Sequence, residues 1–449
     1  MNSRRLAAIA AAAALILGGG GFALVSASSA PGPADPGGAG KTPAGAGAAR
    51  SVRGGAPGTV GRGTWVASWA ASPMSGTTSV GTIPGLSRQT VRNIIYPSVG
   101  GTSLRVRLTN AFGAAPLTAG DVSVGVVLSG ARLVPGSSHA LTFGGKSSVT
   151  IPAGGQALSD PLPMPVRPLE ELAVSLYLPD VTGPPTNHAA AMQANYIAAG
   201  DHAGDPAAAA YATTTPRWLF VGELDVRSAT ADGTIVTFGD SITDGIHSTA
   251  GANDRWPNFL ARRLARLTGD RAPGVVDEGI GGNRVLQASR CFGASAKARF
   301  QQDALSLPGV KAVIVLEGIN DIGFVGSPDG SGCLAPNPPV TAAQIEAGYQ
   351  ALVTMAHARG VKIYLGTLTP FLGRRVNPAV RGREALREAV NNWIRASGAF
   401  DGVIDFARAL QDPRDPTHLR GAYNSGDHLH PNDLGYEAMA DAVPLAIVA

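Results

Sequence analysis

The pattern of apolar and polar positions divides the chain into two long regions with different periodicities. Between residues 64 and 228, apolar residues recur at every second position in several short runs. In the run 104–109, Leu, Val and Leu alternate with Arg, Arg and Thr, and the runs 122–126 and 172–178 alternate in the same way. Gly, Pro and Asn separate these runs. The pattern predicts antiparallel strands with one buried face, arranged as an all-β sandwich.

From Gly233 onward, short continuous apolar runs alternate with segments of helical periodicity. Buried strands are predicted within 235–238, 274–277, 313–316, 361–365 and 403–406. Between them, apolar residues recur at three- and four-residue spacing, and Thr341 with Gln344 forms a capping box at the start of one helix. A last helix is expected to begin near Pro431 or Asn432. This alternation is typical of a parallel sheet with crossover helices, which here predicts a three-layer α/β/α, flavodoxin-like domain over 233–449.

The first 62 residues have a different character from the rest. Residues 1–30 begin with two arginines, continue with an apolar run and end in small residues, which is the form of a secretory signal peptide. An uncleaved membrane anchor is the alternative, although the glycine run 18–21 weakens such a helix. Residues 31–62 are rich in Pro, Gly and Ala without periodicity and are predicted to be a linker. We therefore expect a secreted protein.

Length and charge restrict the function further. A chain of 449 residues, 44% of them hydrophobic, can form two domains with cores of their own. The net charge of +4 is small and no Lys/Arg-rich run is present, which argues against a nucleic-acid partner. After the signal segment, no apolar stretch is long enough to span a membrane.

The chain has two cysteines, Cys291 and Cys333. In an exported protein we expect them to form one disulfide, the alternative being two independent thiols. They do not constitute a metal site, and the histidines of the β-rich region lack ligand spacing. No metal or other cofactor is therefore expected.

Polar residues that could take part in catalysis or ligand binding lie where the predicted parallel strands end. Ser241 follows the first strand, Gly282 follows the second, Asn320 follows the third, and Asp427 and His430 precede the last helix. The carboxyl ends of parallel strands meet at one edge of such a sheet, which is its usual ligand site. We therefore expect these five residues to converge.

Three of these residues have the chemistry of nucleophilic catalysis. The hydroxyl of Ser241 becomes a good nucleophile only when a base takes its proton. The imidazole of His430 suits that role because an ordinary histidine titrates near pH 6.5. Asp427, three residues earlier, can orient the imidazole and stabilise its charged form. His428 is adjacent to the acid and is interpreted as a neighbour rather than the base.

Negative charge that develops on an attacked carbonyl oxygen requires donors that are already in place. The backbone N–H groups of Ser241 and Gly282 and the side-chain amide of Asn320 can supply three such donors. Glycine at position 282 allows a backbone conformation that turns its N–H toward the site. The sequence therefore predicts an oxyanion hole as well as a triad.

The segments that carry these residues resemble the SGNH hydrolases, also called the GDSL lipase/esterase family. Gly239-Asp-Ser241, Gly282-Asn283, Gly318-Ile-Asn320-Asp321 and Asp427-His-Leu-His430 are similar to four of its motif blocks, within 233–449. The β-rich region, with Trp65-Val-Ala-Ser-Trp69, resembles an N-terminal domain of some secreted bacterial members. The resemblance implies the same roles for the residues at these motif positions.

Together these features predict a secreted serine ester hydrolase that acts on short-chain acyl, carbohydrate or aryl esters, small or linked to polysaccharide. A lipid acylhydrolase is the alternative within the enzymes. A non-catalytic carbohydrate-binding surface protein is the alternative from another class. Because all predicted catalytic groups follow Gly233, the region 233–449 is expected to keep its chemistry without residues 64–228.

Some residues keep two interpretations at this stage. Trp65, Trp69 and Trp218 could line a sugar platform or belong to the sandwich core. Arg284 could contact substrate or form a salt bridge. Glu317 could line the site or serve the structure.

Overall fold

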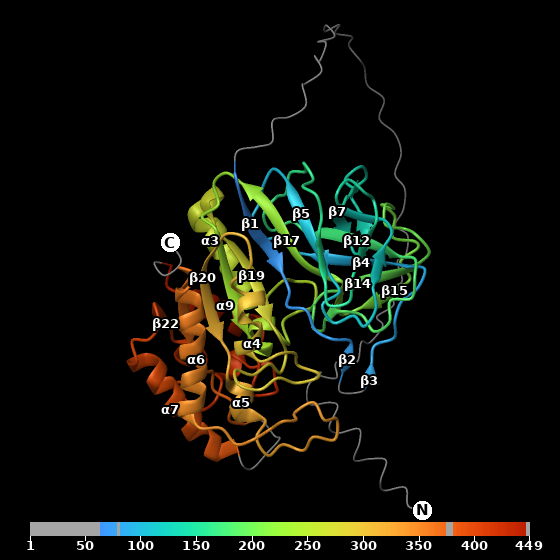
Figure 1. Ribbon diagram of the computed structural model, residues 1–449. Helices are drawn as coiled ribbons and strands as arrows, with labels where there is room; N and C mark the ends of the chain where they lie inside the picture. Colours follow the sequence, from blue (N-terminus) through green and yellow to red (C-terminus); the bar gives the residue numbers. More distant parts are fainter. Residues whose placement is uncertain (1–62, 79–80, 374–379, 446–449) are drawn as a thin grey trace, which may run out of the picture.

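The computed structural model describes residues 63–78, 81–373 and 380–445 of the chain. The predicted signal segment and linker, residues 1–62, lie outside the described residues. Figure 1 shows a strand-rich part, coloured blue to green, beside an α/β part coloured yellow to red. Both predicted fold classes are therefore present in the order expected from the sequence.

The strand-rich part is built from two main antiparallel sheets. One has the order β1-β17-β5-β11, and the other has the order β15-β14-β4-β12-β7-β8 with β9 paired to β7. Three two-stranded sheets, β10-β6, β13-β16 and β2-β3, complete it. The strand bounds are β1 (Thr64–Ala70), β2 (Thr77–Thr78), β3 (Gly81–Thr82), β4 (Gln89–Ile95), β5 (Leu104–Thr109), β6 (Leu117–Ala119), β7 (Val122–Ser129), β8 (Arg132–Leu133), β9 (His139–Ala140), β10 (Val149–Ile151), β11 (Gln156–Leu158), β12 (Leu172–Leu178), β13 (Asn187–His188), β14 (Asn195–Ala199), β15 (Thr213–Thr215), β16 (Trp218–Leu219) and β17 (Val221–Ser228).

The alternating residues of this part form its core as the sequence pattern predicts. Leu104, Val106 and Leu108 of β5 are fully buried, whereas Arg105 and Arg107 between them are only half-buried. The apolar residues of β5 share one hydrophobic cluster with those of β12 in the other sheet. Two sheets with a common core form a sandwich.

The α/β part contains five parallel strands in the order β19-β18-β20-β21-β22. Numbered along this part of the chain, the order is 2-1-3-4-5, which is the flavodoxin-like order. Strand β18, which lies between β19 and β20, is buried along its whole length. The strands are β18 (Thr234–Gly239), β19 (Gly274–Gly279), β20 (Val310–Leu316), β21 (Lys362–Gly366) and β22 (Gly402–Ile404).

Helices cover both faces of this sheet. Helices α4, α6 and α7 pack together on one face, and α3, α8 and α9 pack together on the other. Right-handed crossovers place the helices on these faces, because the chain leaves β18 in one direction for β19 and then returns past it for β20. The helices are α2 (Ser241–Asp244), α3 (Trp256–Thr268), η1 (Gly269–Arg271), α4 (Ala296–Asp303), α5 (Ile319–Gly323), α6 (Ala342–His357), α7 (Val380–Ala396), α8 (Phe406–Leu410), η2 (Gly421–Tyr423) and α9 (Asp433–Ala442).

The two parts meet where β1 packs against β19, the outermost strand of the parallel sheet. The backbone N–H of Ala67 donates to Oγ1 of Thr234 over 3.0 Å. The N–H of Val275 in β19 donates to Oγ of Ser98 over 2.9 Å. These bonds join the strand-rich part directly to β18 and β19 of the sheet that carries the candidate site.

Two of the three tryptophans with an open interpretation belong to the core. Trp69 and Trp218 are buried, and their rings meet edge to face with centroids 5.0 Å apart. Trp65 is half-buried beneath the guanidinium groups of Arg105 and Arg227. The three rings therefore do not form an exposed platform, and the core interpretation is confirmed for Trp69 and Trp218.

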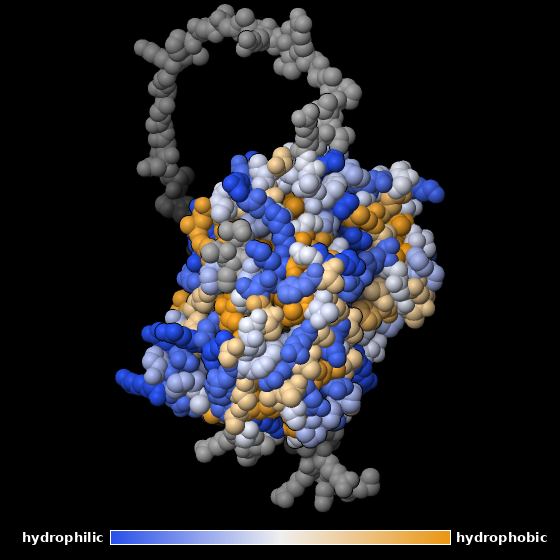
Figure 2. Space-filling view, turned by 60° about the vertical axis from the view of Figure 1, so that its left-hand side comes forward, coloured by the Kyte–Doolittle hydropathy of each residue, from blue (hydrophilic) through white to orange (hydrophobic). Residues whose placement is uncertain are grey.

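The surface has no single broad apolar region on the face seen in Figure 2, where hydrophobic areas are interspersed with hydrophilic residues. The large exposed hydrophobic side chains include Phe112, Leu128 and Leu434, which lie on separate elements or loops. No helix in the described part of the chain is both long and apolar enough to cross a membrane.

Candidate active site

Ser241 lies at the first position of a single helical turn that directly follows β18. Asp240 caps this turn, because its Oδ1 accepts from the N–H of Ile242 over 3.0 Å. Gly245 ends the turn in a left-handed conformation with φ of 80°. The buried strand and the capped turn together hold the hydroxyl of Ser241 at the carboxyl edge of the sheet.

His430 and Asp427 lie on a loop before α9, and the loop backbone orients both. Oδ1 of Asp427 accepts from the N–H groups of Leu429 and His430 over 2.9 and 2.8 Å. His428 adopts a φ of 63°, which reverses the chain within the loop and lets its neighbours three residues apart meet. The ring of His428 bonds to Asn424 instead of entering the site. Asn432, rather than Pro431, caps the last helix, which begins at Asp433.

The three residues form a continuous series of hydrogen bonds. Nε2 of His430 lies 2.8 Å from Oγ of Ser241, and Nδ1 of His430 lies 2.5 Å from Oδ2 of Asp427. Burial raises the pKa of Asp427, but hydrogen bonds from His247 and His430 outweigh it and hold that pKa well below its usual range. The carboxylate is therefore ionised at neutral pH and favours the tautomer of His430 with a proton on Nδ1.

The expected oxyanion donors line the same pocket. In the described part of the chain, the N–H groups of Ser241 and Gly282 have no hydrogen-bond acceptor. Gly282 has a φ of 79°, and a Cβ at this position would lie 2.7 Å from the ring of Phe292. Asn320 donates from Nδ2 to the backbone carbonyl of Asn283 over 3.0 Å, which orients its amide and leaves the second N–H for a ligand.

Arg299 of α4 connects these loops by hydrogen bonds, a role that was not predicted from the sequence. Its Nη2 donates to the carbonyl of Gly239, its Nη1 to the carbonyl of Glu278, and its Nε to Oδ1 of Asn283, all within 2.8–2.9 Å. The guanidinium therefore joins the ends of β18 and β19 to the Gly282 loop. An arginine on a helix carries no local sequence signal for this role, since its partners lie on segments far from it in the sequence.

His247 is a second residue that sequence reasoning missed. Its Nε2 lies 3.6 Å from Oδ2 of Asp427, and its ring centroid lies 5.4 Å from that of His430. Potential ligand atoms of these three residues lie within 4.8 Å of one another, so they could together hold a metal ion. The only available signal was its position six residues after Ser241.

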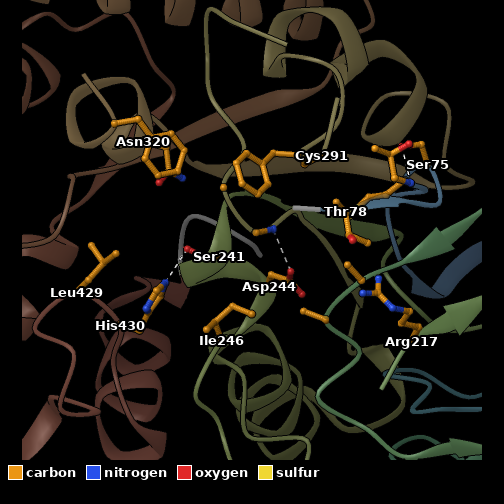
Figure 3. A pocket seen from close by; sticks show the side chains of 18 residues that line it. Ser75, Thr78, Arg217, Ser241, Asp244, Ile246, Cys291, Asn320, Leu429 and His430 are labelled. Atoms are coloured by element: carbon orange, nitrogen blue, oxygen red, sulfur yellow. Dashed lines mark hydrogen bonds between the residues drawn. The ribbon is translucent and has the colours of Figure 1, made fainter. Parts of the chain in front are cut away.

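The pocket at Ser241 has walls from both parts of the chain. It has a volume of about 840 Å³, including solvent at its mouth. Figure 3 shows Ser241 and His430 on one side of it and Ser75, Thr78 and Arg217 on the other. Residues 74–78, 189–190 and 217 form part of the pocket. The region 233–449, which was expected to keep its chemistry alone, therefore contains the predicted catalytic groups but lacks part of the pocket that would bind the substrate.

The remaining sequence candidates have structural partners. Arg284 is buried and donates to the carbonyls of Ala288, Leu334 and Pro336. Among the described residues it has no salt-bridge partner, and it does not line the pocket. Glu317 is buried against Arg299 and serves the structure. Asp321 accepts from the N–H groups of Val285 and Leu286, so it bonds the loop that follows Gly282.

The two cysteines form a disulfide beside the pocket. Cys291 and Cys333 are 42 positions apart in sequence and their Cα atoms are 5.3 Å apart. They form a small apolar cluster with Phe292, Phe324 and Leu334. Cys291, Phe292 and Phe324 line the pocket, so the disulfide supports one of its walls.

A serine, a histidine and an aspartate in hydrogen-bond series at the edge of a parallel sheet define the class of serine hydrolases. Residues 237–438 match the model of the GDSL-like Lipase/Acylhydrolase family, so this part of the chain is a domain of that family. The resemblance inferred from the motif blocks is thereby confirmed for this part of the chain, and it supports an enzyme that hydrolyses esters. Comparison with curated protein sequences gave no match.

Three solved structures that match part of the chain are distant from it in sequence. An alpha/beta hydrolase from the metagenome of Lake Arreo, Spain, has 22% identity and a TM-score of 0.36, over 49% of this chain and 96% of its own. An acetylxylan esterase from Geobacillus stearothermophilus has 20% identity and a TM-score of 0.36, over 47% and 93%. A GDSL-like lipase from Bacteroides thetaiotaomicron has 19% identity and a TM-score of 0.33, over 48% and 87%.

Proposed function

We propose that this protein is a secreted serine esterase that cleaves carboxylic esters through an acyl-enzyme on Ser241. The observation that carries the proposal is the series of hydrogen bonds from Ser241 through His430 to Asp427, at the floor of a pocket within the family domain. The disulfide agrees with export to an oxidising compartment.

In the first half of the reaction, Oγ of Ser241 attacks the ester carbonyl as Nε2 of His430 takes its proton. The positive charge that results on the imidazole is stabilised by Asp427, which is already ionised and within 2.5 Å of Nδ1. His430 then gives the proton to the leaving alcohol. In the second half, His430 takes a proton from a water molecule as the water oxygen attacks the acyl carbonyl. The bond from that carbon to Oγ of Ser241 then breaks, His430 returns the proton to Oγ, and the acid leaves.

The tetrahedral intermediates carry their negative charge on the former carbonyl oxygen. The N–H groups of Ser241 and Gly282 and Nδ2 of Asn320 would donate to it. Loss of one such donor typically costs about 2.7–4 kcal/mol of transition-state stabilisation. Arg299 contributes indirectly by holding the strand ends and the loop that carry these donors.

The pocket suits a short acyl group or an aromatic alcohol. Its walls include the apolar side chains of Met74, Ile246 and Phe292. Apolar walls close to the candidate nucleophile favour small acyl groups and aromatic rings over charged ones. We therefore propose acetyl and aryl esters as the preferred substrates.

The decisive experiment combines turnover with labelling. Purified protein lacking residues 1–30 would be assayed on nitrophenyl esters of increasing acyl length, and separately treated with an organophosphonate that modifies activated serines. We expect turnover that is fastest on the short esters, and mass spectrometry should locate the label on Ser241. A fully folded protein that neither turns over any ester nor accepts the label would contradict the proposal.

A further inference from the structure

We infer that Arg217 forms an anion-binding subsite in the catalytic pocket, so that the natural ester carries a carboxylate away from the bond that is cleaved. This inference rests on the proposed function, because it names a feature of the substrate of the same site. It concerns a residue of the strand-rich part, outside the family domain.

The position of Arg217 is the first observation. Arg217 lines the pocket together with Ser241 and His430, and Figure 3 shows its guanidinium on the side of the pocket away from them. A ligand whose ester carbonyl lies at Ser241 would therefore extend toward the guanidinium. In this arrangement the ester end of a substrate lies at Ser241 and its other end lies near the guanidinium of Arg217.

The second observation is that the guanidinium is held in place by an uncharged partner. Nη1 of Arg217 donates to Oδ1 of Asn187 over 2.9 Å. Asn187 is buried, and its Nδ2 faces the carbonyls of Met74, Ser75 and Pro185, which fixes the direction of its Oδ1. Among the described residues this is the single hydrogen bond of the guanidinium, so Nε and Nη2 are available to a ligand.

The third observation is the absence of a counter-charge. Within the described ranges, no carboxylate lies within 4.0 Å of the Arg217 guanidinium. Burial lowers the pKa of Arg217 without an opposing acidic neighbour, yet a guanidinium stays charged at neutral pH. A partly buried cation without a counter-charge is unfavourable until an anion binds.

Asp244 also lines the pocket, but its charge is already balanced. Its Oδ1 lies 3.0 Å from Nε2 of His188, and its Oδ2 accepts from the N–H of Gly281 over 3.1 Å. Burial alone would lower the pKa of His188, but the adjacent Asp244 carboxylate raises it overall. The neutral His188–Asp244 pair therefore does not repel an anion, whereas Arg217 attracts one. A carboxylate matches the planar donors of the guanidinium better than a single point charge would.

The test uses ester pairs that differ in charge but not in shape. One pair is para-acetoxybenzoate and para-acetoxybenzamide, with the variable group on the alcohol. The other is monophenyl succinate and its terminal amide, with the variable group on the acyl chain. For wild-type protein we expect kcat/KM to favour the carboxylate of at least one pair, and added salt to reduce that preference.

Arg217→Gln should reduce the ratio of kcat/KM between carboxylate and amide by roughly tenfold or more. Arg217→Lys keeps the charge but loses the planar N–H donors of the guanidinium, so it should give an intermediate ratio. It replaces the Gln variant in the experiment if that variant does not fold. Arg132→Gln, at an exposed arginine outside the pocket, is the matched control and should leave the ratio unchanged. Equal ratios in wild type and both Arg217 variants would overturn the inference.

A binding measurement separates this inference from the proposed function. Ser241→Ala protein would be titrated calorimetrically with both carboxylate esters, with and without Arg217→Gln. Binding that weakens roughly tenfold on loss of the arginine supports the subsite even if wild type shows no turnover. Turnover by wild type without any dependence of binding on Arg217 would leave the esterase proposal intact and remove the subsite.

Discussion

Nε2 of His188 lies 3.0 Å from Oδ1 of Asp244, and each of these side chains is only 3% exposed. His188 belongs to β13 of the strand-rich part, whereas Asp244 ends the helical turn that begins at Ser241. The same carboxylate accepts from the N–H of Gly281, next to the candidate oxyanion donor Gly282. The strand-rich part therefore takes part in positioning both loops of the site.

The first prediction concerns this pair. His188→Ala leaves a buried carboxylate without its ring partner, and breaking such a pair typically costs about 3 kcal/mol or more of unfolding free energy. We expect kcat/KM to fall as well, because the Gly281–Gly282 loop loses its anchor. Urea unfolding and ester kinetics measure the two effects. His139→Ala, at an exposed histidine of the same part, is the control, and equal stability of the two variants would refute the role.

Ser241→Ala is expected to lower kcat by several powers of ten, because the members of a triad act as a unit. The fold should be retained, since the hydroxyl bonds only to His430 among the hydrogen bonds of the described residues. Circular dichroism and a melting curve establish the fold before kinetics are measured. Ester turnover close to wild type by the folded variant would exclude Ser241 as the nucleophile.

The two histidines of the loop before α9 allow a matched comparison. We expect His430→Ala to resemble Ser241→Ala and His428→Ala to keep most activity, because only His430 reaches Ser241. Asp427→Asn should be intermediate, since it alters the tautomer of His430 but not its position. Measured kcat values in the reverse order for the two histidines would show that the base is misassigned.

The same triad predicts a pH dependence of the reaction. Asp427 stays ionised well below neutral pH, because His247 and His430 outweigh the effect of burial on its pKa. The acidic limb of the profile therefore reports protonation of the base, and kcat/KM should rise with pH across the range in which histidines ordinarily titrate. A rate that is independent of pH between 5 and 8 would contradict general-base catalysis by histidine.

Buried acids near the site predict that stability decreases as pH rises. Burial raises the pKa of Asp240 to about 7 and that of Asp321 to about 6. The folded protein thus keeps protons that the unfolded chain loses near pH 4, and the stability they contribute is lost as pH rises toward 7. His188, whose pKa is also raised, changes stability in the same direction. Melting temperatures should be higher at pH 5 than at pH 8.

Asp240→Asn tests this explanation. Its Oδ1 can still cap the turn of Ser241, whereas the titrating group is removed, so the dependence of melting temperature on pH should become shallower. In the parent chain, Oδ2 of Asp240 is buried without a hydrogen-bond partner among the described residues, which fits a protonated acid. Asp270→Asn, at an exposed aspartate, should keep the wild-type slope. An unchanged slope in Asp240→Asn would remove this group as a cause.

The disulfide gives a prediction about both stability and binding. Replacing Cys291 and Cys333 by serine should cost about 2–4 kcal/mol of unfolding free energy. KM should increase more than kcat falls, because Cys291 and Phe292 line the pocket but take no part in the hydrogen bonds of Ser241, His430 and Asp427. Denaturation and kinetics of the double variant provide the measurement, with reduced wild-type protein as its reference. Unaltered stability would show that the bond contributes nothing to the folded state.

Most of the sheet could be predicted from the sequence because its strands are continuous apolar runs. The start of β20 was misplaced by three positions, since the polar Lys311 interrupts the run after Val310. The capping box at Thr341 correctly predicted the start of α6. In the strand-rich part, the alternation within 104–109 correctly predicted which side chains are buried.

The candidate site was predictable only where its residues follow strands or lie close in sequence. Ser241, Gly282 and Asn320 follow parallel strands, and the three-residue spacing from Asp427 to His430 indicated a turn. Arg217 and His188 could not be found in this way, because they reach the site from a different part of the fold. No local spacing encodes a contact across such separations. The catalytic roles themselves remain predictions for the experiments above.

The junction between β1 and β19 has a consequence for the independence of the two parts. On its outer side, β19 would present unpaired backbone groups, and Ser98 satisfies one of them at Val275. Exposed strand edges invite pairing with other chains. A truncated chain beginning near Ala231 would uncover this edge whichever catalytic groups it keeps. Such a fragment should self-associate as its concentration increases. We therefore expect the sandwich to cover the edge strand of the hydrolase sheet and so to prevent aggregation.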